Sequence, residues 1–240
     1  MNEVKVTGLV LKAIDYKEKD KLITIFTVEL GIISCVLKGV MGAKAKLKFA
    51  SLPFCFAEFV LAEKNGFFTV TECSQIESFY NVVTDYNKSL FGFFMLELTC
   101  IIMRSNEPDE HWFVLLLNYL KELCYGKTNV YVLGVKFILE TLKKCGYQID
   151  TKVCDTCGLN FLGDVYLDFE TGELKCETCY TPNSSKLSKQ EFNSLKIIDS
   201  TEIEKLNTVK LNDLILQSLI TNLKKNLEFR INHKIKSLLF

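Results

Sequence analysis

The sequence lacks several features that would indicate other classes of protein. Only three of its 240 residues are proline, which excludes long proline-rich linkers. Basic and acidic residues number 29 each, so the chain is not a globally basic nucleic-acid binder, and any polyanion must bind to local patches. The longest apolar run, Leu90–Met103, is interrupted by Glu97 and is too short to span a bilayer. The N-terminal MNEVKVTG is followed closely by the charged DYKEKDK, so we expect no signal peptide and a soluble, cytoplasmic protein.

Catalytic patterns are also missing. The only histidines, His111 and His233, lie near no Ser, Cys or acidic arrangement that would make either of them a base. No GxxxxGK[ST] motif and no dinucleotide-binding fingerprint occurs. Pairs of Asp and Glu residues are plentiful, but in a helical protein they normally lie on solvent-exposed helix faces. We therefore expect a protein that is not an enzyme and has no small-molecule substrate.

The hydrophobic pattern changes once, near residue 80, from strand-like to helical. Before this point, Asn65-Gly66 predicts a hairpin, because both central residues of a type I′ turn need a positive φ. Five short strands in about eighty residues predict a small closed barrel, for which an OB-fold is the best candidate and an SH3-like barrel fits nearly as well. The expected strands are residues 4–14, 22–27, 32–37, 54–62 and 67–71.

After residue 80, apolar residues recur at helical spacing. Asp85 is a candidate N-cap for the first long helix, and Gly146 is suited to end the third. A polar stretch, 181–185, separates a cysteine-containing segment from the last helices. The expected helices are residues 86–104, 112–125, 130–145, 187–198, 202–206 and 212–239.

Ten cysteines are present, and four of them form two CxxC pairs, Cys154–Cys157 and Cys176–Cys179, eighteen residues apart. A CxxC turn places two thiolates on one side of a tight knuckle, and two knuckles joined by a hairpin complete a tetrahedron. Glu170-Thr171-Gly172 predicts the hairpin turn between them, and Gly158 follows the first knuckle, where backbone N–H groups can point at the sulfurs. The other six cysteines stand singly in apolar stretches: Cys35, Cys55, Cys73, Cys100, Cys124 and Cys145.

This spacing predicts one structural Zn²⁺ per chain, held by Cys154, Cys157, Cys176 and Cys179. With all four ligand positions filled by protein, no site remains for water or substrate. One alternative is four unrelated core cysteines. Another is a redox CxxC pair, which is a poor match because no thioredoxin-like βαβ pattern surrounds it.

Lysines are concentrated in the loop after the third expected strand. Lys38, Lys44, Lys46 and Lys48 fall in an eleven-residue window without an acidic residue. Alternation at positions 44, 46 and 48 would direct these side chains to one face of an extended segment, which suits a groove that follows a phosphate backbone. The alternative is a strand edge that lysines protect against strand addition.

The order of these features resembles the RecO family of bacterial DNA repair and recombination mediators, over essentially the whole chain. The most specific stretch is Val135–Glu140 with Leu142, Gly146-Tyr147 and Asp150, which leads directly into Cys154–Gly158. The other matching segments are Gly8–Leu11, Tyr16–Leu22, Gly31, Lys38–Val40, Phe94–Leu98, Asn106–Asp109, Leu167–Phe169 with Gly172, and Cys176–Cys179. Two departures stand out: the family's basic loop is often arginine-rich, and Lys234–Leu239 retains only part of the usual basic-Ser-Leu ending.

The resemblance implies an α+β fold. A five-stranded OB-fold barrel (1–80) would bind DNA, and a helical domain would follow in two parts (81–150 and 183–240), with a zinc-ribbon-like insertion at 151–182. It implies binding of single- and double-stranded DNA, annealing of complementary strands, and loading of RecA on DNA coated by single-strand DNA-binding protein, with RecR as partner. It also implies association with the nucleoid during repair. The alternative function is a zinc-stabilised protein–protein adaptor without direct DNA binding.

The resemblance also points to the acidic, apolar-ended tail of single-strand DNA-binding protein as a docking element. Such a tail needs an apolar slot for its terminal Phe and cations for its carboxylates. We expect this site on the helical body, at Arg104, Lys224, Lys225, Arg230, Lys234 and Lys236. The alternative is that these cations only cap and solubilise a helix.

Overall fold

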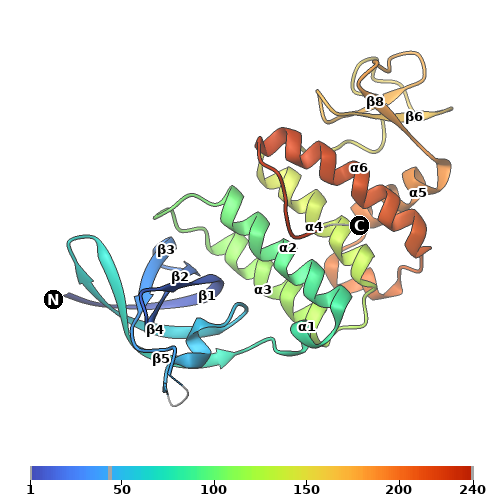
Figure 1. The fold of residues 1–240 in the computed structure, drawn as a ribbon. Helices are drawn as coiled ribbons and strands as arrows, with labels where there is room; N and C mark the ends of the chain where they lie inside the picture. Colours follow the sequence, from blue (N-terminus) through green and yellow to red (C-terminus); the bar gives the residue numbers. More distant parts are fainter. Residues whose placement is uncertain (1, 43–44, 239–240) are drawn as a thin grey trace. The chain divides into compact units, whose positions relative to one another are not determined.

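A computed structural model describes residues 2–42 and 45–238 (Figure 1). The chain forms two compact units, Met1–Cys124 and Tyr125–Phe240. In the described parts of the chain, no helix is long and apolar enough to cross a membrane.

The first unit begins with a closed barrel whose strands follow the order β1-β2-β3-β5-β4. β1 closes it by pairing antiparallel with β4, and β3 pairs in parallel with β5. This OB-like arrangement confirms the predicted fold class. The strands are β1 (Asn2–Tyr16), β2 (Asp20–Thr27), β3 (Gly31–Leu37), β4 (Phe56–Lys64) and β5 (Phe67–Glu77), the last extending six residues beyond its predicted end.

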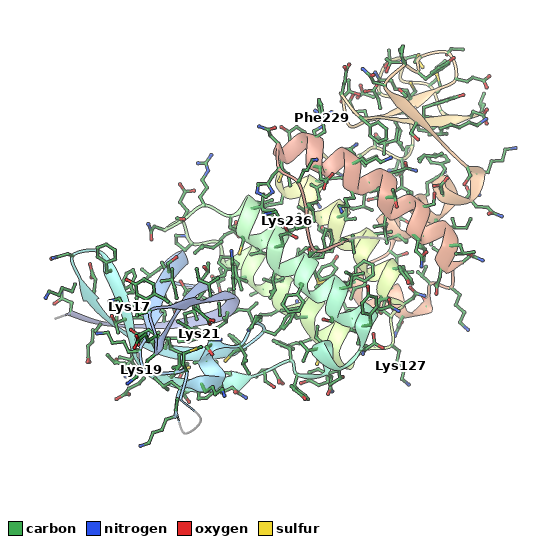
Figure 2. All side chains as sticks on the ribbon, in the orientation of Figure 1. Lys17, Lys19, Lys21, Lys127, Phe229 and Lys236 are labelled. Atoms are coloured by element: carbon green, nitrogen blue, oxygen red, sulfur yellow. The ribbon has the colours of Figure 1, made fainter. Side chains whose placement is uncertain are left out.

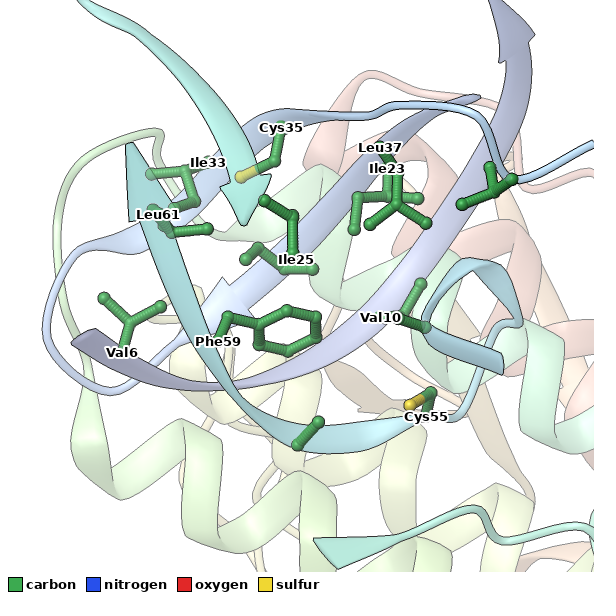
Figure 3. Packing of buried hydrophobic residues seen from close by; sticks show 14 residues of the cluster. Val6, Val10, Ile23, Ile25, Ile33, Cys35, Leu37, Cys55, Phe59 and Leu61 are labelled. Carbon is green, nitrogen blue, oxygen red and sulfur yellow. The ribbon is translucent and has the colours of Figure 1, made fainter. Parts of the chain in front are cut away.

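The barrel forms because alternate residues of each strand carry apolar side chains into its interior. Figure 3 shows the resulting core, with side chains from β1 to β4 meeting between the strands. Asn65 and Gly66 have φ values of +53° and +78°, which confirms the predicted turn between β4 and β5. The labelled core residues are Val6, Val10, Ile23, Ile25, Ile33, Cys35, Leu37, Cys55, Phe59 and Leu61.

Three helices complete the first unit: α1 (Asn81–Thr84), α2 (Tyr86–Ile102) and α3 (Glu110–Tyr125). The Asp85 carboxylate accepts the Lys88 N–H (2.9 Å), which confirms the predicted cap. Phe26 of β2 meets Phe113 of α3 edge to face at 5.3 Å between ring centroids, and Phe54 meets Phe93 of α2 at 4.9 Å. The barrel and these helices are therefore joined by aromatic contacts.

The segment after α2 also pairs with the barrel. Ser105 bridges to Ile32 of β3, and the Asn106 N–H donates to the Ile32 carbonyl at 3.2 Å. Gly31 has φ +65°, and a Cβ on it would lie 2.3 Å from the Glu107 carbonyl oxygen. A side chain at Gly31 would therefore push this segment off the barrel.

Gly31→Ala is expected to lower the free energy of unfolding by about 2–5 kcal/mol, because it adds a backbone clash to left-handed strain. Gly39→Ala is the matched control, since Gly39 has a similar φ of +67° and nothing within 4 Å of its would-be Cβ. Its cost should be about 1–2 kcal/mol, from strain alone. Urea denaturation of both variants measures the difference, and equal costs would contradict the proposed packing role of Gly31.

The second unit consists of helices and a small sheet ordered β7-β6-β8. Gly146, with φ +84°, follows the end of α4 as predicted. Asn129 caps α4 and donates to the Asp213 carboxylate (2.7 Å) at the start of α6. The elements are α4 (Val130–Lys144), β6 (Val165–Asp168), β7 (Leu174–Cys176), β8 (Ser184–Leu187), α5 (Lys189–Ser200), the 3-10 helix η2 (Ile203–Thr208) and α6 (Asp213–Ile231).

Three predictions for this unit are wrong in detail. The polar stretch after the cysteines contains the start of strand β8, which pairs with β6 and includes Leu187, the predicted first residue of a helix. The predicted helix at 202–206 is the 3-10 helix η2. The last helix ends at Ile231, because Asn232 takes a left-handed conformation (φ +48°), and the following residues do not continue it.

The chain beyond Asn232 turns back onto α6. The Ile235 N–H donates to the Glu228 carboxylate (2.8 Å), and the Lys224 ammonium donates to the Leu238 carbonyl. Ile235 and Leu238 are both buried, so an apolar contact accompanies these bonds. Leu239, the predicted end of the helix, lies outside the described residues.

Candidate functional site

Four thiols converge beside the small sheet of the second unit. Cys154 and Cys157 precede β6, Cys176 is the last residue of β7, and Cys179 follows it. Their Sγ atoms all lie within 4.8 Å of one another, and those of Cys157 and Cys176 are 3.9 Å apart. A tetrahedral Zn²⁺ site with Zn–S bonds of about 2.3 Å needs sulfurs about 3.8 Å apart. The four thiols are therefore arranged to hold a metal ion, and among the described residues they are the only such group of His, Cys, Asp or Glu.

Local backbone bonds explain why the two knuckles meet. The Gly158 N–H donates to the Cys154 carbonyl (2.8 Å), with Gly158 at φ +70°, and the Asp155 N–H donates to the Leu174 carbonyl of β7 (3.2 Å). The Cys176 N–H points at the Cys154 sulfur from 3.4 Å. The predicted hairpin is confirmed, since Gly172 has φ +73° and its N–H donates to the Asp168 carbonyl (2.7 Å).

The cysteines of the cluster differ in acidity: the pKa is lowered at Cys154 and Cys176 and raised at Cys157 and Cys179. Hydrogen bonding from the Thr178 hydroxyl, 3.0 Å from the Cys176 sulfur, is the main cause that lowers the pKa of Cys176 to about 6. Burial instead raises the pKa of Cys35 to about 12 and that of Cys55 to about 11. Metal ions bind thiolates, so the acidic thiol of Cys176 favours metal binding, and the buried thiols of the barrel core do not.

A buried carboxylate, Asp168, holds the hairpin that carries the second knuckle. It accepts the N–H groups of Glu170 and Thr171 (2.9 Å each), the Thr181 hydroxyl (2.6 Å) and the Lys175 ammonium (3.0 Å). Burial by itself would raise the pKa of Asp168, but these hydrogen bonds outweigh it and hold the pKa far below its ordinary value. The stabilisation it provides is therefore present above about pH 4 and is lost only as the pH falls further. No role was predicted for Asp168 from its sequence context.

The predicted lysine loop does not have the predicted backbone. Lys38, Lys46 and Lys48 are exposed, and Lys44 lies outside the described residues. Lys46 is in a turn and Lys48 begins a short 3-10 helix, η1 (Lys48–Ser51), so the prediction of an extended segment with alternating lysines is wrong here. This segment leads to Ala50 and Ser51, which are buried. Hydrogen bonds between residues a few positions apart form successive turns there and satisfy the backbone N–H groups.

The loop lies against the β1–β2 turn, which the sequence analysis missed as a source of cations. The Met41 N–H donates to the Lys19 carbonyl (3.2 Å), and the Gly39 N–H donates to the Asp20 carboxylate (2.9 Å). These bonds bring exposed Lys17 and Lys19 beside the loop that carries Lys38, and Figure 2 labels both on the barrel. The predicted OB-fold could have indicated Lys17 and Lys19 as candidates, because the loop between the first two strands of an OB-fold commonly contacts nucleic acid.

Comparison with known proteins identifies a family over nearly the whole chain. Residues 1–79 match the family description "Recombination protein O N terminal", and residues 83–239 match "Recombination protein O C terminal". The chain belongs to the RecO family. It is 27% identical over 237 residues to the DNA repair protein RecO of Clostridium novyi (strain NT), covering 98% of this chain and 91% of that protein. It is 28% identical over 211 residues to the DNA repair protein RecO of Caldicellulosiruptor bescii, covering 88% and 86% of the two chains.

The six cationic side chains predicted to bind a partner differ in their burial and in their contacts within this RecO-family chain. Lys224 is half-buried and holds the C-terminal residues, and the Arg230 guanidinium lies over the Tyr147 ring at 5.0 Å. Arg104 belongs to the first unit and lies 3.7 Å from the Glu107 carboxylate. Lys225, Lys234 and Lys236 are exposed. Lys224 and Arg230 are therefore engaged within the fold.

Proposed function

We propose that this RecO-family protein is a mediator of DNA repair and homologous recombination, and not an enzyme. In this role it binds single- and double-stranded DNA, anneals complementary strands and acts with RecR to load RecA on DNA coated by single-strand DNA-binding protein. It works in the cytoplasm, associated with the nucleoid during repair. Family membership supports the repair role.

The observation that carries direct DNA binding is the pairing of the β1–β2 turn with the β3–η1 loop. It gathers the exposed side chains of Lys17, Lys19 and Lys38 at one end of an OB-like barrel. Lysine ammonium groups on flexible stems contact phosphates without reading sequence. A surface of this kind suits a protein that must bind DNA of any sequence.

The metal of the four-cysteine cluster is, in this proposal, a structural Zn²⁺. Four thiolates at tetrahedral spacing are the donor set that zinc prefers, and they leave no open position for a substrate. Its role is to join two knuckles that are too short to fold alone.

The tail of single-strand DNA-binding protein is proposed to dock on the second unit. A cavity of about 430 Å³ lies there, lined by Phe169 and Pro182 from the region of the small sheet and by Phe229 of α6, which is labelled in Figure 2. Glu170, Asn183 and Ser184 complete its lining. The apolar side chains support a slot for a terminal Phe side chain, and the exposed Lys225, Lys234 and Lys236 of the same unit are the cations proposed for the carboxylates of the tail.

A salt titration of oligonucleotide binding tests the function. The protein should bind a fluorescent single strand at low salt and lose affinity steeply as salt rises. The triple variant Lys17→Ala, Lys19→Ala, Lys38→Ala should bind more weakly, and its log–log slope should flatten by up to about three. A matched triple variant at exposed lysines of the second unit, Lys127, Lys189 and Lys210, should keep the wild-type slope.

Two outcomes would contradict this proposal. Absence of binding at every salt concentration would favour the adaptor function. Binding with an unchanged slope in the barrel variant would exclude these loops as the interface. Folding should be nearly unaffected in both variants, because exposed lysines contribute little to stability.

A further inference from the structure

Outward-facing residues of β1, β2, β3 and β5 form one continuous surface on the barrel. The strand registers pair Ile14 with Leu22, Leu22 with Val36, and Val36 with Thr69. Their neighbours along the strands point into the barrel core, so this row points outward. We call the surface around Ile14, Leu22, Val36 and Thr69 the platform.

Two aromatic rings extend the platform along its outer strands. Phe67 precedes Thr69 by two residues on β5 and therefore faces the same way, with 76% of its surface exposed. Tyr16 follows Ile14 by two residues on β1, and both are exposed. Because β1 and β5 run in the same direction, the registers put Tyr16 and Phe67 at diagonally opposite corners. An exposed face with aromatic and aliphatic residues is a mark of a binding surface.

Lysines border this apolar surface. Lys12 lies on β1 in the next outward row, beside Thr24, and Lys17, Lys19 and Lys38 lie at the end where Tyr16 stands. At the end where Tyr16 stands, Asp15 pairs with Lys21 (3.8 Å), Asp20 accepts the Gly39 N–H, and Glu18 is exposed. With Lys17, Lys19, Lys21 and Lys38 beside these three acids, this end of the platform is cationic on balance.

We infer that the platform binds the unstacked bases of single-stranded DNA, with Phe67 as the principal stacking residue and Tyr16 as the second. Flat apolar rings on a surface with lysines at one end complement a polyanion that also offers flat apolar rings. A duplex hides its base faces, so the rings add affinity only for the single strand. The Lys17 ammonium lies 5.1 Å from the centroid of the Tyr16 ring, so a cation and a ring share that corner. This inference rests on the proposed DNA binding and adds to it the basis of single-strand preference.

The test compares two probes with the same phosphates, an oligothymidylate of about 16 nucleotides and an abasic strand of the same length. The full-length wild type should bind the thymidylate more tightly, by about fivefold or more per stacked base. Phe67→Ala should reduce this ratio about fivefold or more and leave affinity for duplex DNA unchanged. Tyr86→Ala is the matched control, because Tyr86 is 77% exposed on α2, off the barrel, and should leave the ratio unchanged.

The outcomes separate the two levels of the proposal. Equal wild-type affinity for both probes, or an unchanged ratio in Phe67→Ala, would overturn the stacking role while leaving DNA binding intact. No binding of either probe at low salt would overturn the proposed function itself. Thermal unfolding of Phe67→Ala should match the wild type because the ring is mostly exposed, so a lost ratio reports on base contact.

Discussion

Removal of the metal, or replacement of Cys154 or Cys176 by serine, is expected to lower the free energy of unfolding by several kcal/mol. The knuckles are held together by a few backbone bonds and by the four sulfurs, so the energy of metal binding is largely folding energy here. Metal analysis of the purified protein should find about one zinc per chain. Thermal unfolding with and without a chelator measures the stabilisation.

Cys145→Ser is the matched control, because Cys145 is a half-buried thiol of the same unit outside the cluster. It should change the melting temperature much less than either ligand variant. Because the site is closed, DNA-related activity should fall in step with folded protein and not before it. A metal-free chain with an unchanged melting temperature would contradict the metal assignment.

A fragment that ends at residue 80 is expected to lose cooperative unfolding, whereas residues 1–124 should retain it. Phe26 and Phe54 are almost fully buried, and their ring partners are Phe113 and Phe93 of the two helices. Phe56 also lies 6.0 Å from the Phe113 ring. Exposing Phe26, Phe54 and the partly buried Phe56 costs about 5 kcal/mol, which is comparable to the whole stability of a small domain.

Urea denaturation followed by far-UV circular dichroism compares the two fragments. For residues 1–124, the single tryptophan, Trp112, gives a second probe, because it is 1% exposed and its indole N–H donates to the Thr99 hydroxyl at 3.2 Å. Equal midpoints for both fragments would show that the barrel is independent of α2 and α3.

Some features of this protein follow from residues close together in the sequence. Positive φ angles form the predicted turn at Asn65-Gly66 and follow the predicted helix end at Gly146. The Asp85 side chain caps a helix that starts at the next residue, as its residue type predicts. The four cysteines form a similar case, because the CxxC spacing and the turn at Gly172 bring the sulfurs together almost by themselves. The resemblance to the RecO family was also based on short segments, among them Gly146-Tyr147 and the two CxxC pairs, and the family match confirms it.

Other features were decided only by tertiary contacts. Strand β8 has polar residues and exists because β6 offers it a partner, and α6 stops at Ile231 where the chain turns back onto its own helix. Lys17 and Lys19 stand among acids in the sequence, yet the folded barrel engages Asp15 and Asp20 and leaves these lysines beside Lys38. The sequence by itself determined the turns, the caps and the four-cysteine cluster, because their geometry is satisfied largely within a few residues. Which charges remain available and which apolar faces meet depended on the tertiary fold, because these are properties of surfaces built from distant segments.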